Sequence, residues 1–316
     1  MTKDPSGSPV AYGGKPSCSA GSLRTEDSVK RVKDVTLYQL FKTRTPIIGV
    51  VHLLPLPTSP RWGGSLKAVI DRAEQEATAL ASGGVDGIIV ENFFDAPFPK
   101  NQVDPAVVSA MTVVVQRIQN LVTLPVGINV LRNDGRSAIA IATCTKAQFI
   151  RLNVLTGVMA TDQGIIEGEA HQLLRYRREL GSDVKIFADV LVKHARPLSA
   201  VNLTTAVQDT IERGLADAVI MSGWATGDPP NLQDLEMATS AAHGTPVFIG
   251  SGASWENIGT LLVAADGVIV SSALKRHGRR EQPIDPNRVS QFVEAARKGW
   301  NSKEETQSIP SVKLHS

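Results

Sequence analysis

The sequence predicts an α/β protein with the fold of a closed (β/α)8 barrel, the TIM barrel, on three observations. Short apolar runs that start at proline recur at residues 46, 125 and 246, and runs that start at aspartate recur at residues 86, 217 and 266. Helical patterns fill the gaps between these runs. The repeat of about 30 residues covers about 250, the usual size of such a barrel. An open doubly wound sheet is the alternative, but eight units of similar length favour closure.

Eight strands are expected to begin near residues 46, 85, 125, 147, 184, 217, 246 and 266. Their runs are nearly continuous in valine and isoleucine, which is typical of parallel strands covered on both faces. Proline is tolerated at the first residue of a strand because its missing N–H falls at the edge of the ladder.

Helices are predicted from apolar residues that share one face at helical spacing. One such face has residues 66, 69, 70, 73, 77 and 80, and a second has residues 107, 108, 111, 114, 115 and 118. Leu173, Leu174 and Leu180 indicate a third helix, Ser254 resembles an N-cap, and the last helix lies near Arg288 to Lys298.

The predicted domain organisation is a single barrel at 34–300, between a disordered N-terminal extension (1–33) and a flexible C-terminal tail (301–316). The extension is rich in Ser, Gly, Pro and Lys and buries too little apolar surface to offset its ordering entropy. A transit peptide is the alternative, against which Asp4, Glu26 and Asp27 argue.

The composition gives no sign of a nucleic-acid-binding, disulfide-rich or membrane-spanning protein. A net charge of +2 gives no indication of nucleic-acid or membrane binding. The two cysteines, Cys18 and Cys144, lie far apart, so no disulfide framework is expected and a reducing compartment is indicated. No apolar run approaches the roughly 20 residues that span a bilayer, so any membrane association is expected to be peripheral.

Polar residues follow the predicted strands, at the end of a TIM barrel where active sites lie. In strand order they are His52; Glu91, Asn92 and Asp95; Asn129, Arg132 and Asn133; Arg151 and Asn153; Asp189, Lys193 and His194; and Ser222, Trp224 and Thr226. We expect these side chains to meet around the mouth of the barrel, although any one of them can be a solvated loop residue or a helix cap.

Asp189 stands out because an unpaired carboxylate inside an apolar run is costly to bury. Lys193 or Arg151 would serve as its partner, in a structural ion pair or in a catalytic or ligand-binding site. Glu91 and Asp189 facing each other would tune each other's pKa for acid/base work or hold a divalent cation. We predict catalytic roles for Glu91, Asp189 and Lys193. No Cys/His cluster has zinc spacing, so no metal site is assigned, and the sequence identifies no cofactor.

A ligand site for phosphate is predicted after the seventh and eighth strands. Gly250, Ser251 and Gly252, followed by Ser271 and Ser272, would present backbone N–H groups and a short helix to an anion. The alternative is that the glycines only permit a tight turn. The predicted ligand-binding set also contains His52, Asn129, Arg151 and Asn153, with a buried core histidine as the other interpretation of His52.

Two further stretches have open interpretations. The basic run at 275–280 is either a solvated loop or a segment that reaches ligand phosphate or anionic lipid headgroups. The proline-rich loops after the first two strands carry Trp62, Phe93, Phe94 and Phe98, which would pack over the barrel rim or form an interface between copies of the chain.

Several longer motifs, PIIGVVHLLPLP, VENFFDAPF, GINVLRND, FIRLN, DVLVKHA, GWATG and FIGSG, together resemble the BtpA family from about Leu37 to Arg297. The stretch from LYQLF to GGSL is similar to its cyanobacterial branch, although the long N-terminal extension departs from the family's usual start. The resemblance implies a TIM barrel of the phosphate-binding type. It also implies a role in accumulating or stabilising photosystem I, with reaction-centre proteins or their assembly machinery as partners.

The same resemblance implies an extrinsic protein on the cytoplasmic face of thylakoid membranes, and it assigns no catalytic residue. Two functional hypotheses therefore stand. The first is a photosystem I biogenesis factor that acts through protein contacts. The second is a barrel enzyme acting on a phosphorylated sugar or nucleotide-like small molecule, whose loss would affect photosystem I indirectly.

Overall fold

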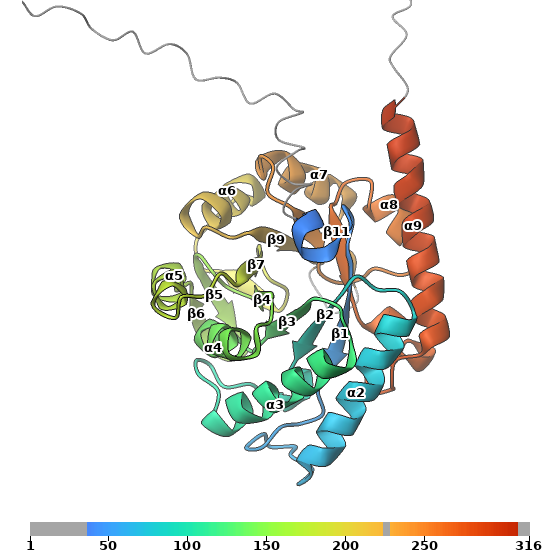
Figure 1. Cartoon of the computed structure of the whole chain (residues 1–316). Helices are drawn as coiled ribbons and strands as arrows, with labels where there is room; N and C mark the ends of the chain where they lie inside the picture. Colours follow the sequence, from blue (N-terminus) through green and yellow to red (C-terminus); the bar gives the residue numbers. More distant parts are fainter. Residues whose placement is uncertain (1–36, 224–227, 309–316) are drawn as a thin grey trace, which may run out of the picture.

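The computed structural model describes residues 37–223 and 228–308, in which eight parallel strands close into a barrel (Figure 1). Each strand begins within two residues of its predicted start, and β1 pairs with both β2 and β11 to close the ring. The barrel strands are β1 (Ile47–His52), β2 (Gly87–Glu91), β3 (Val126–Asn129), β4 (Phe149–Leu152), β7 (Lys185–Asp189), β9 (Ala218–Met221), β10 (Val247–Ile249) and β11 (Gly267–Val270). The predicted TIM barrel is confirmed.

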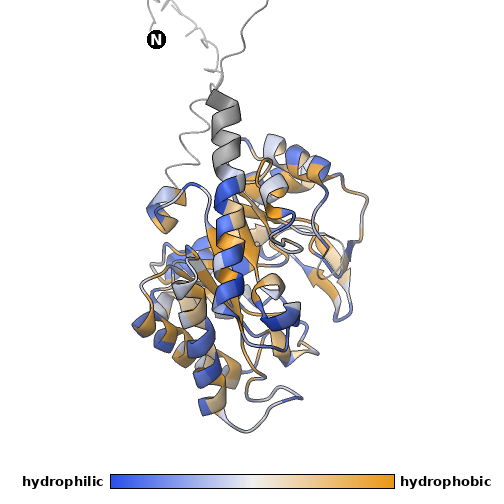
Figure 2. Cartoon of the chain, turned by 90° about the vertical axis from the view of Figure 1, so that its right-hand side faces the viewer, coloured by the Kyte–Doolittle hydropathy of each residue, from blue (hydrophilic) through white to orange (hydrophobic). Residues whose placement is uncertain are grey.

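Helices surround the barrel, and the two longest predicted faces are the buried ones (Figure 1). The α-helices are α2 (Leu66–Ser82), α3 (Pro105–Leu121), α4 (Gly135–Thr145), α5 (Ala170–Glu179), α6 (Leu203–Gln208), α7 (Leu232–Ala241), α8 (Ile258–Leu261) and α9 (Pro286–Ser308). Helix α9 extends beyond residue 301, where we placed the start of the tail. Figure 2 shows hydrophilic residues along α9 and hydrophobic ones in the strands behind it.

The recurring aspartates have a common structural role at the amino ends of the strands. Each accepts a hydrogen bond through Oδ2 from the backbone N–H of the first or second residue of the neighbouring strand. The pairs are Asp86 with Ile47 at 2.8 Å, Asp217 with Ile186 at 2.9 Å and Asp266 with Val247 at 2.9 Å. This contact satisfies a donor that has no ladder partner, which explains why the motif repeats along the sequence.

The barrel interior pairs large side chains with small ones on adjacent strands. The register partners are Phe149 with Gly127, Phe187 with Ala218 and Phe248 with Gly267. The Phe187 ring centroid lies 4.9 Å from that of Phe149 and 5.1 Å from that of Phe248. An eight-stranded barrel has only enough interior for its own side chains, so a glycine or alanine opposite each ring makes room for it.

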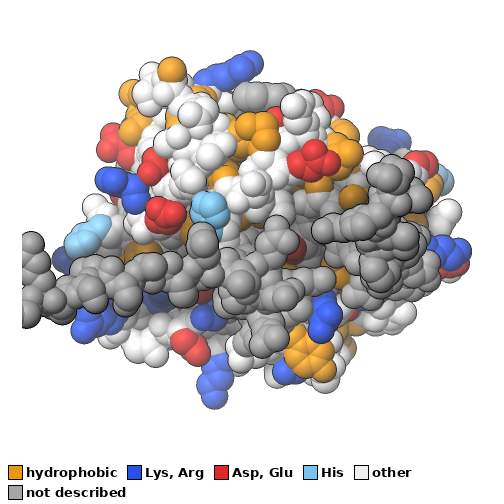
Figure 3. All heavy atoms as spheres, turned by 90° about the horizontal axis from the view of Figure 1, so that it is seen from above, with side chains coloured by type: hydrophobic (Ala, Val, Ile, Leu, Met, Phe, Trp, Pro, Cys, Tyr) orange, Lys and Arg blue, Asp and Glu red, His pale blue; other side chains and the backbone are white. Residues whose placement is uncertain are grey.

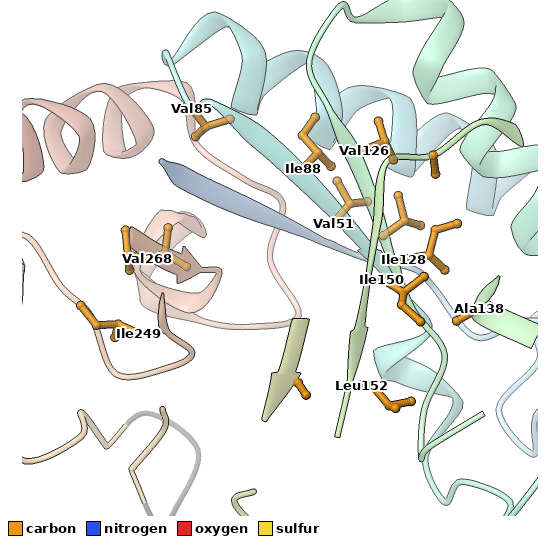
Figure 4. Close-up of a cluster of buried hydrophobic side chains, with 14 of the residues drawn as sticks. Val51, Val85, Ile88, Val126, Ile128, Ala138, Ile150, Leu152, Ile249 and Val268 are labelled. Atoms are coloured by element: carbon orange, nitrogen blue, oxygen red, sulfur yellow. The ribbon is translucent and has the colours of Figure 1, made fainter. Parts of the chain in front are cut away.

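Residues 37–41 are helical and close the amino-terminal end of the barrel. Phe41 lies edge-on to Phe149 at 5.5 Å and against Gly87 at the start of β2. A second apolar layer lies between the strands and the helices, where Ala138 of α4 gathers with Ile150 and Leu152 of β4 (Figure 4). Among the described residues the barrel interior is therefore a packed core, and its cavity lies at the carboxyl ends of the strands.

A three-stranded antiparallel sheet interrupts the barrel repeat and was not predicted. It consists of β5 (Val158–Thr161), β6 (Gly164–Glu167) and β8 (Ala195–Pro197), in the loops that follow β4 and β7. Met159 and Ile166 on its inner face are buried beside Val154 and Val192. Its strands have only three or four residues, with one buried residue each in β5 and β6 and none in β8, so they lack the continuous apolar run that predicts a barrel strand.

No helix within the described ranges is long and apolar enough to cross a membrane. On the described part of the face shown in Figure 3, acidic and basic side chains are interspersed. The predicted disordered extension, the last residues of the predicted tail (309–316) and the candidate residues Trp224 and Thr226 lie outside the described residues.

Candidate functional site

The carboxyl ends of the barrel strands enclose a cavity with two lobes. The inner lobe has a volume of about 220 Å³ and the outer lobe about 640 Å³. They are contiguous because both are lined by Glu91, Phe93, Arg151, Lys193 and Arg280. A ligand with two chemically different parts can therefore occupy both.

Most of the predicted site residues meet in this cavity. The inner lobe is lined by His52, Gly250, Ser251, Gly252, Ser271 and Ser272 in addition to the shared residues. Asn129, Asn153 and His194 line the outer lobe. Asp189 is the exception, since it lies behind Arg151 and lines neither lobe.

Asp189 forms a buried, bidentate ion pair with Arg151. Arg151 Nε donates to Asp189 Oδ2 at 2.9 Å and Nη2 donates to Oδ1 at 2.8 Å, while Asn153 Nδ2 lies 3.3 Å from Oδ2. Burial works against the charge of Arg151, but the adjacent Asp189 carboxylate raises its pKa above the usual value. Of the two partners proposed for Asp189, the structure thus selects Arg151. The pair presents the guanidinium, not the carboxylate, to the cavity.

His52 and Glu91 lie side by side at the ends of β1 and β2. His52 Nε2 is 3.8 Å from Glu91 Oε1, and His52 Nδ1 is 3.4 Å from the hydroxyl of Ser271. Burial, followed by the charge of Lys275, holds the pKa of His52 well below its usual value. Burial raises the pKa of Glu91, and Asp189 adds to the effect against the opposing charge of Arg151. The site thus combines a neutral imidazole with a carboxyl group that retains its proton more readily than usual.

The ring of Phe93 supports this pair from one side. It stacks on the His52 imidazole with a centroid distance of 4.2 Å and an interplanar angle of 14°. Arg280 lies over the same ring at 5.7 Å from its centroid. The stacking fixes the orientation of the imidazole, so that Nε2 faces Glu91 and Nδ1 faces Ser271.

Lys193 projects from the loop after β7 and lines both lobes. Its backbone carbonyl accepts a hydrogen bond from Arg132 Nη2 at 2.9 Å, which anchors the loop. Within the described ranges its ammonium group has no hydrogen-bond or ion-pair partner. Burial, and then the charge of Arg151, lowers the pKa of Lys193. A half-buried amine of this kind is suited to bind an anion or to act as a nucleophile.

The glycine loop after β10 has a conformation that requires glycine at one position. Gly252 has φ +76°, and a Cβ there would collide with the backbone of Asp228 and Pro229. At Gly250 a Cβ would lie 2.6 Å from the Ser222 hydroxyl and 3.4 Å from Arg151 Nη2. The loop therefore brings bare backbone close to the guanidinium, as an anion site needs. The short helical turn Ser272–Leu274 follows β11 on the other side of the inner lobe.

Other polar residues predicted at the mouth have structural roles instead. Asn92 Oδ1 accepts from the backbone N–H of Leu131 at 2.7 Å, and Asn133 Oδ1 accepts from that of Val154 at 2.8 Å. Asp95 accepts from the N–H of Leu56 at 2.7 Å. These contacts link the loops after β1, β2, β3 and β4 in turn, so they shape this part of the mouth.

The basic run at 275–280 divides into residues with different roles. Lys275 is fully buried and its ammonium lies 2.7 Å from both carboxylate oxygens of Glu76 in α2. Arg280 lines both lobes, whereas Arg276 and Arg279 are exposed. The solvated-loop interpretation is therefore wrong for Lys275, which ties the loop after β11 to α2. Arg280 is placed to reach a ligand, as the second interpretation expects.

Two kinds of cavity residue were missed. Asp162 and Gln163 line the outer lobe from the turn between β5 and β6, and Arg61 lines it from the loop after β1. The turn between the paired residues Thr161 and Gly164 is not one of the usual glycine-containing hairpin dipeptides, so the sequence carried no clear signal for the first two. The half-buried rings of Phe94 and Phe98 also line this lobe, while Trp62 packs against the core. This agrees with the expectation that the aromatic residues pack at the rim.

Among the described residues, no group of three or more His, Cys, Asp or Glu side chains is arranged to hold a metal ion. The pairing of Glu91 with Asp189 as cation ligands is disfavoured for a local reason. Both Asp189 oxygens accept hydrogen bonds from Arg151, which leaves Glu91 as the carboxyl group on the cavity surface shared by the lobes.

Comparison with known proteins gives consistent results. A model of the BtpA family matches residues 43–298. The photosystem I biogenesis protein BtpA of Synechocystis sp. is 75% identical over 267 residues, which cover 84% of this chain and 93% of the relative. An uncharacterised protein of Thermococcus kodakarensis is 48% identical over 254 residues, which cover 80% and 96%.

Among solved structures, the wild-type GGGPS from Thermoplasma volcanium is similar with a TM-score of 0.51. The likeness covers 87% of this chain and 97% of that chain at 15% identity. At this level of identity the likeness supports the TIM-barrel fold alone.

Proposed function

The chain belongs to the BtpA family, and we propose that it is a photosystem I biogenesis or stabilisation factor whose barrel binds a phosphate-type ligand. The first half of this proposal rests on the 75% identity to the Synechocystis protein over almost its whole length. We further propose that the chain is an extrinsic protein on the cytoplasmic face of the thylakoid membrane, and the name of the same relative supports an association with photosystem I biogenesis. Its proposed partners are photosystem I reaction-centre proteins or their assembly machinery.

The ligand half of the proposal rests on the inner lobe. Among its described lining residues, Arg151, Lys193 and Arg280 carry positive charge and Glu91 is the carboxyl group. Glycine and serine backbone from the loops after β10 and β11 completes the wall. Cations together with bare backbone N–H groups at this end of a barrel favour an anion such as phosphate.

The decisive experiment for the biological role is replacement of the Synechocystis relative by this chain. We expect photosystem I accumulation, measured as the ratio of the two photosystems in low-temperature fluorescence, to return to that of the parent strain. If the chain accumulates in the cells but photosystem I does not, the proposed role is wrong.

A pair of variants connects the ligand site to that role. Arg280→Gln removes a cation that lines both lobes, whereas Arg279→Gln removes its exposed neighbour. We expect only Arg280→Gln to weaken binding of inorganic phosphate and to reduce photosystem I accumulation. If the two variants change phosphate binding and photosystem I accumulation equally, the proposed link between the ligand site and the biogenesis role is wrong.

A second candidate function is an enzyme acting on a phosphorylated sugar or nucleotide-like small molecule. It is favoured by Glu91, whose buried carboxyl group has a raised pKa and lies next to His52, whose pKa is lowered, because such a pair suits acid/base work. In this reading Glu91 is the acid/base, Lys193 binds or attacks the substrate, and Asp189 is a positioning residue that acts through Arg151.

One substitution distinguishes the two candidates. Glu91→Gln keeps the shape of the side chain but cannot transfer a proton. If the chain is an enzyme, we expect Glu91→Gln to abolish photosystem I accumulation while phosphate still binds. If the chain acts by binding alone, we expect no loss of photosystem I. In that case larger losses are expected from changes at the exposed Pro97 and Pro99 of the loop at 97–99, whose middle residue, Phe98, lines the outer lobe.

A further inference from the structure

The outer lobe contains a buried hydrogen-bond acceptor with no protein partner. Asn129 is only 2% exposed and its Oδ1 accepts no hydrogen bond from the described residues. Its Nδ2 donates to the backbone carbonyl of Arg151 at 3.0 Å, which fixes the orientation of the amide. The free oxygen belongs to a residue that lines the lobe, so it calls for an N–H or O–H donor on a ligand.

A second acceptor of the same kind comes from the hairpin between β5 and β6. Gln163 Oε1 is buried and unpartnered among the described residues, and Gln163 lines the same lobe. Its Nε2 donates to Asp162, which again leaves the oxygen as the free atom. Two residues of different elements that line one cavity thus each hold a buried amide oxygen without a partner among the described residues, and both of these atoms are acceptors.

An apolar wall forms the other part of the outer lobe. Phe94, Phe98, Ala96 and Leu131 line it together with Phe93. Phe93 stacks on His52 and Phe94 lies edge-on to Phe93 at 5.4 Å, and both Phe94 and Phe98 are half-buried at the cavity surface. A simple phosphorylated triose would leave this wall uncovered in a lobe of about 640 Å³. Aromatic side chains and amide acceptors are the combination by which proteins bind a nucleobase, through its π-face and its exocyclic N–H groups.

We infer that the two lobes together bind a phosphorylated nucleoside. The phosphate occupies the inner lobe near Arg151, and the base lies in the outer lobe against Phe94 and Phe98. Donors on the base or ribose reach Asn129 Oδ1 and Gln163 Oε1. This inference rests on the proposed phosphate-type site and specifies the class of ligand that occupies it.

Titration calorimetry of the full chain tests the inference with defined probes: inorganic phosphate, ribose 5-phosphate, and the 5′-monophosphates of adenosine, guanosine, cytidine and uridine. We expect at least one nucleotide to bind at least 10-fold more tightly than ribose 5-phosphate. If ribose 5-phosphate binds as tightly as every nucleotide, the base site is wrong and the phosphate site stands. If no phosphorylated probe binds, both proposals are wrong.

Matched variants locate the base. Gln163→Leu and Phe98→Leu should each weaken the preferred nucleotide by roughly 5-fold or more while leaving ribose 5-phosphate unchanged. Gln233→Leu, at an exposed position of α7, is the control and should change neither. The ratio of the two affinities is the informative quantity, because a general loss of folded protein would lower both together. An unchanged ratio in both test variants would overturn the assignment of the outer lobe.

Discussion

The guanidinium of Arg151 and the carboxylate of Asp189 meet in parallel, with Nε–Oδ2 and Nη2–Oδ1 distances of 2.9 and 2.8 Å. The Asp189 side chain is fully buried and that of Arg151 is only 6% exposed. Asp189 is the last residue of β7 and Arg151 lies in the neighbouring β4, so the pair crosses the floor of the cavity. It fixes a positive charge where an anionic ligand would bind.

Asp189→Asn should therefore reduce both stability and ligand binding. The substitution leaves Arg151 buried without a counter-charge, which costs about 3–5 kcal/mol when a buried pair is broken. Urea unfolding measures the loss. Asp71→Asn is the control, because Asp71 pairs with Lys67 on the surface and such pairs contribute about 0–1 kcal/mol. Equal and small losses in the two variants would show that the pair contributes little to holding the floor of the cavity.

Gly252→Ala should abolish most of the affinity for inorganic phosphate. A methyl group at this position meets the backbone of Asp228 and Pro229 and pushes the loop away from the inner lobe. Gly64 has nearly the same φ, +77° against +76°, but a Cβ there meets no atom within 4 Å. Both alanine variants carry backbone strain of about 1–3 kcal/mol, so Gly64→Ala controls for strain alone.

Calorimetry on the two variants, each shown to be folded by circular dichroism, gives the comparison. We expect phosphate affinity to fall at least about 10-fold in Gly252→Ala, equivalent to about 1.4 kcal/mol, and to stay unchanged in Gly64→Ala. Unaltered binding by a folded Gly252→Ala protein would mean that the glycine serves only the turn.

The order of the barrel strands could be predicted because the sequence signals of each strand lie within the strand and the residues next to it. A Pro or Asp start, a run of valine and isoleucine, and a polar end are all contained within a few residues, as in the run from Asp217 to Ser222. Closure follows from the count of equal units. The sequence did not show the β5–β6–β8 sheet, because its short strands come from two separate loops, after β4 and after β7, and lack a continuous apolar run.

The site was predictable as a group but not in its internal pairings. Strand ends converge in any barrel, so Glu91, Arg151 and Lys193 could be placed together. Which charge neutralises Asp189 depends on side-chain geometry across two strands, and spacing along the chain does not encode that. Lys275 shows the same limit, since its partner Glu76 is 199 residues away on α2.

Gly127→Ala should destabilise the barrel without touching the site. Gly127 is the register partner of Phe149, and a methyl group there collides with the phenyl ring in the filled interior. Overpacking of this kind costs about 1–3 kcal/mol. Gly63→Ala is the control, because a Cβ at Gly63 meets nothing within 4 Å. Urea midpoints should fall for Gly127→Ala only. A urea midpoint equal to that of the parent would show that the barrel interior accommodates the extra methyl group without overpacking, contrary to the prediction.

Glu91→Gln should make the protein more stable than the parent at pH 7 and equally stable near pH 4. Burial raises the pKa of Glu91 above 4.5, so the folded parent binds a proton that the unfolded chain has already released. Stability of the parent therefore falls as pH rises from about 4.5 through the raised pKa, and the neutral glutamine avoids this loss.

Thermal unfolding of both proteins across this pH range tests the sign, and the values near pH 4 serve as the internal reference. A gain in stability at neutral pH together with loss of photosystem I support would indicate that the charged or titrating carboxyl group is retained for function at the expense of stability. A variant less stable than the parent at pH 7 would instead show that the Glu91 carboxylate is stabilised by Arg151 and Lys193, and it would argue against Glu91 as a proton donor near neutral pH.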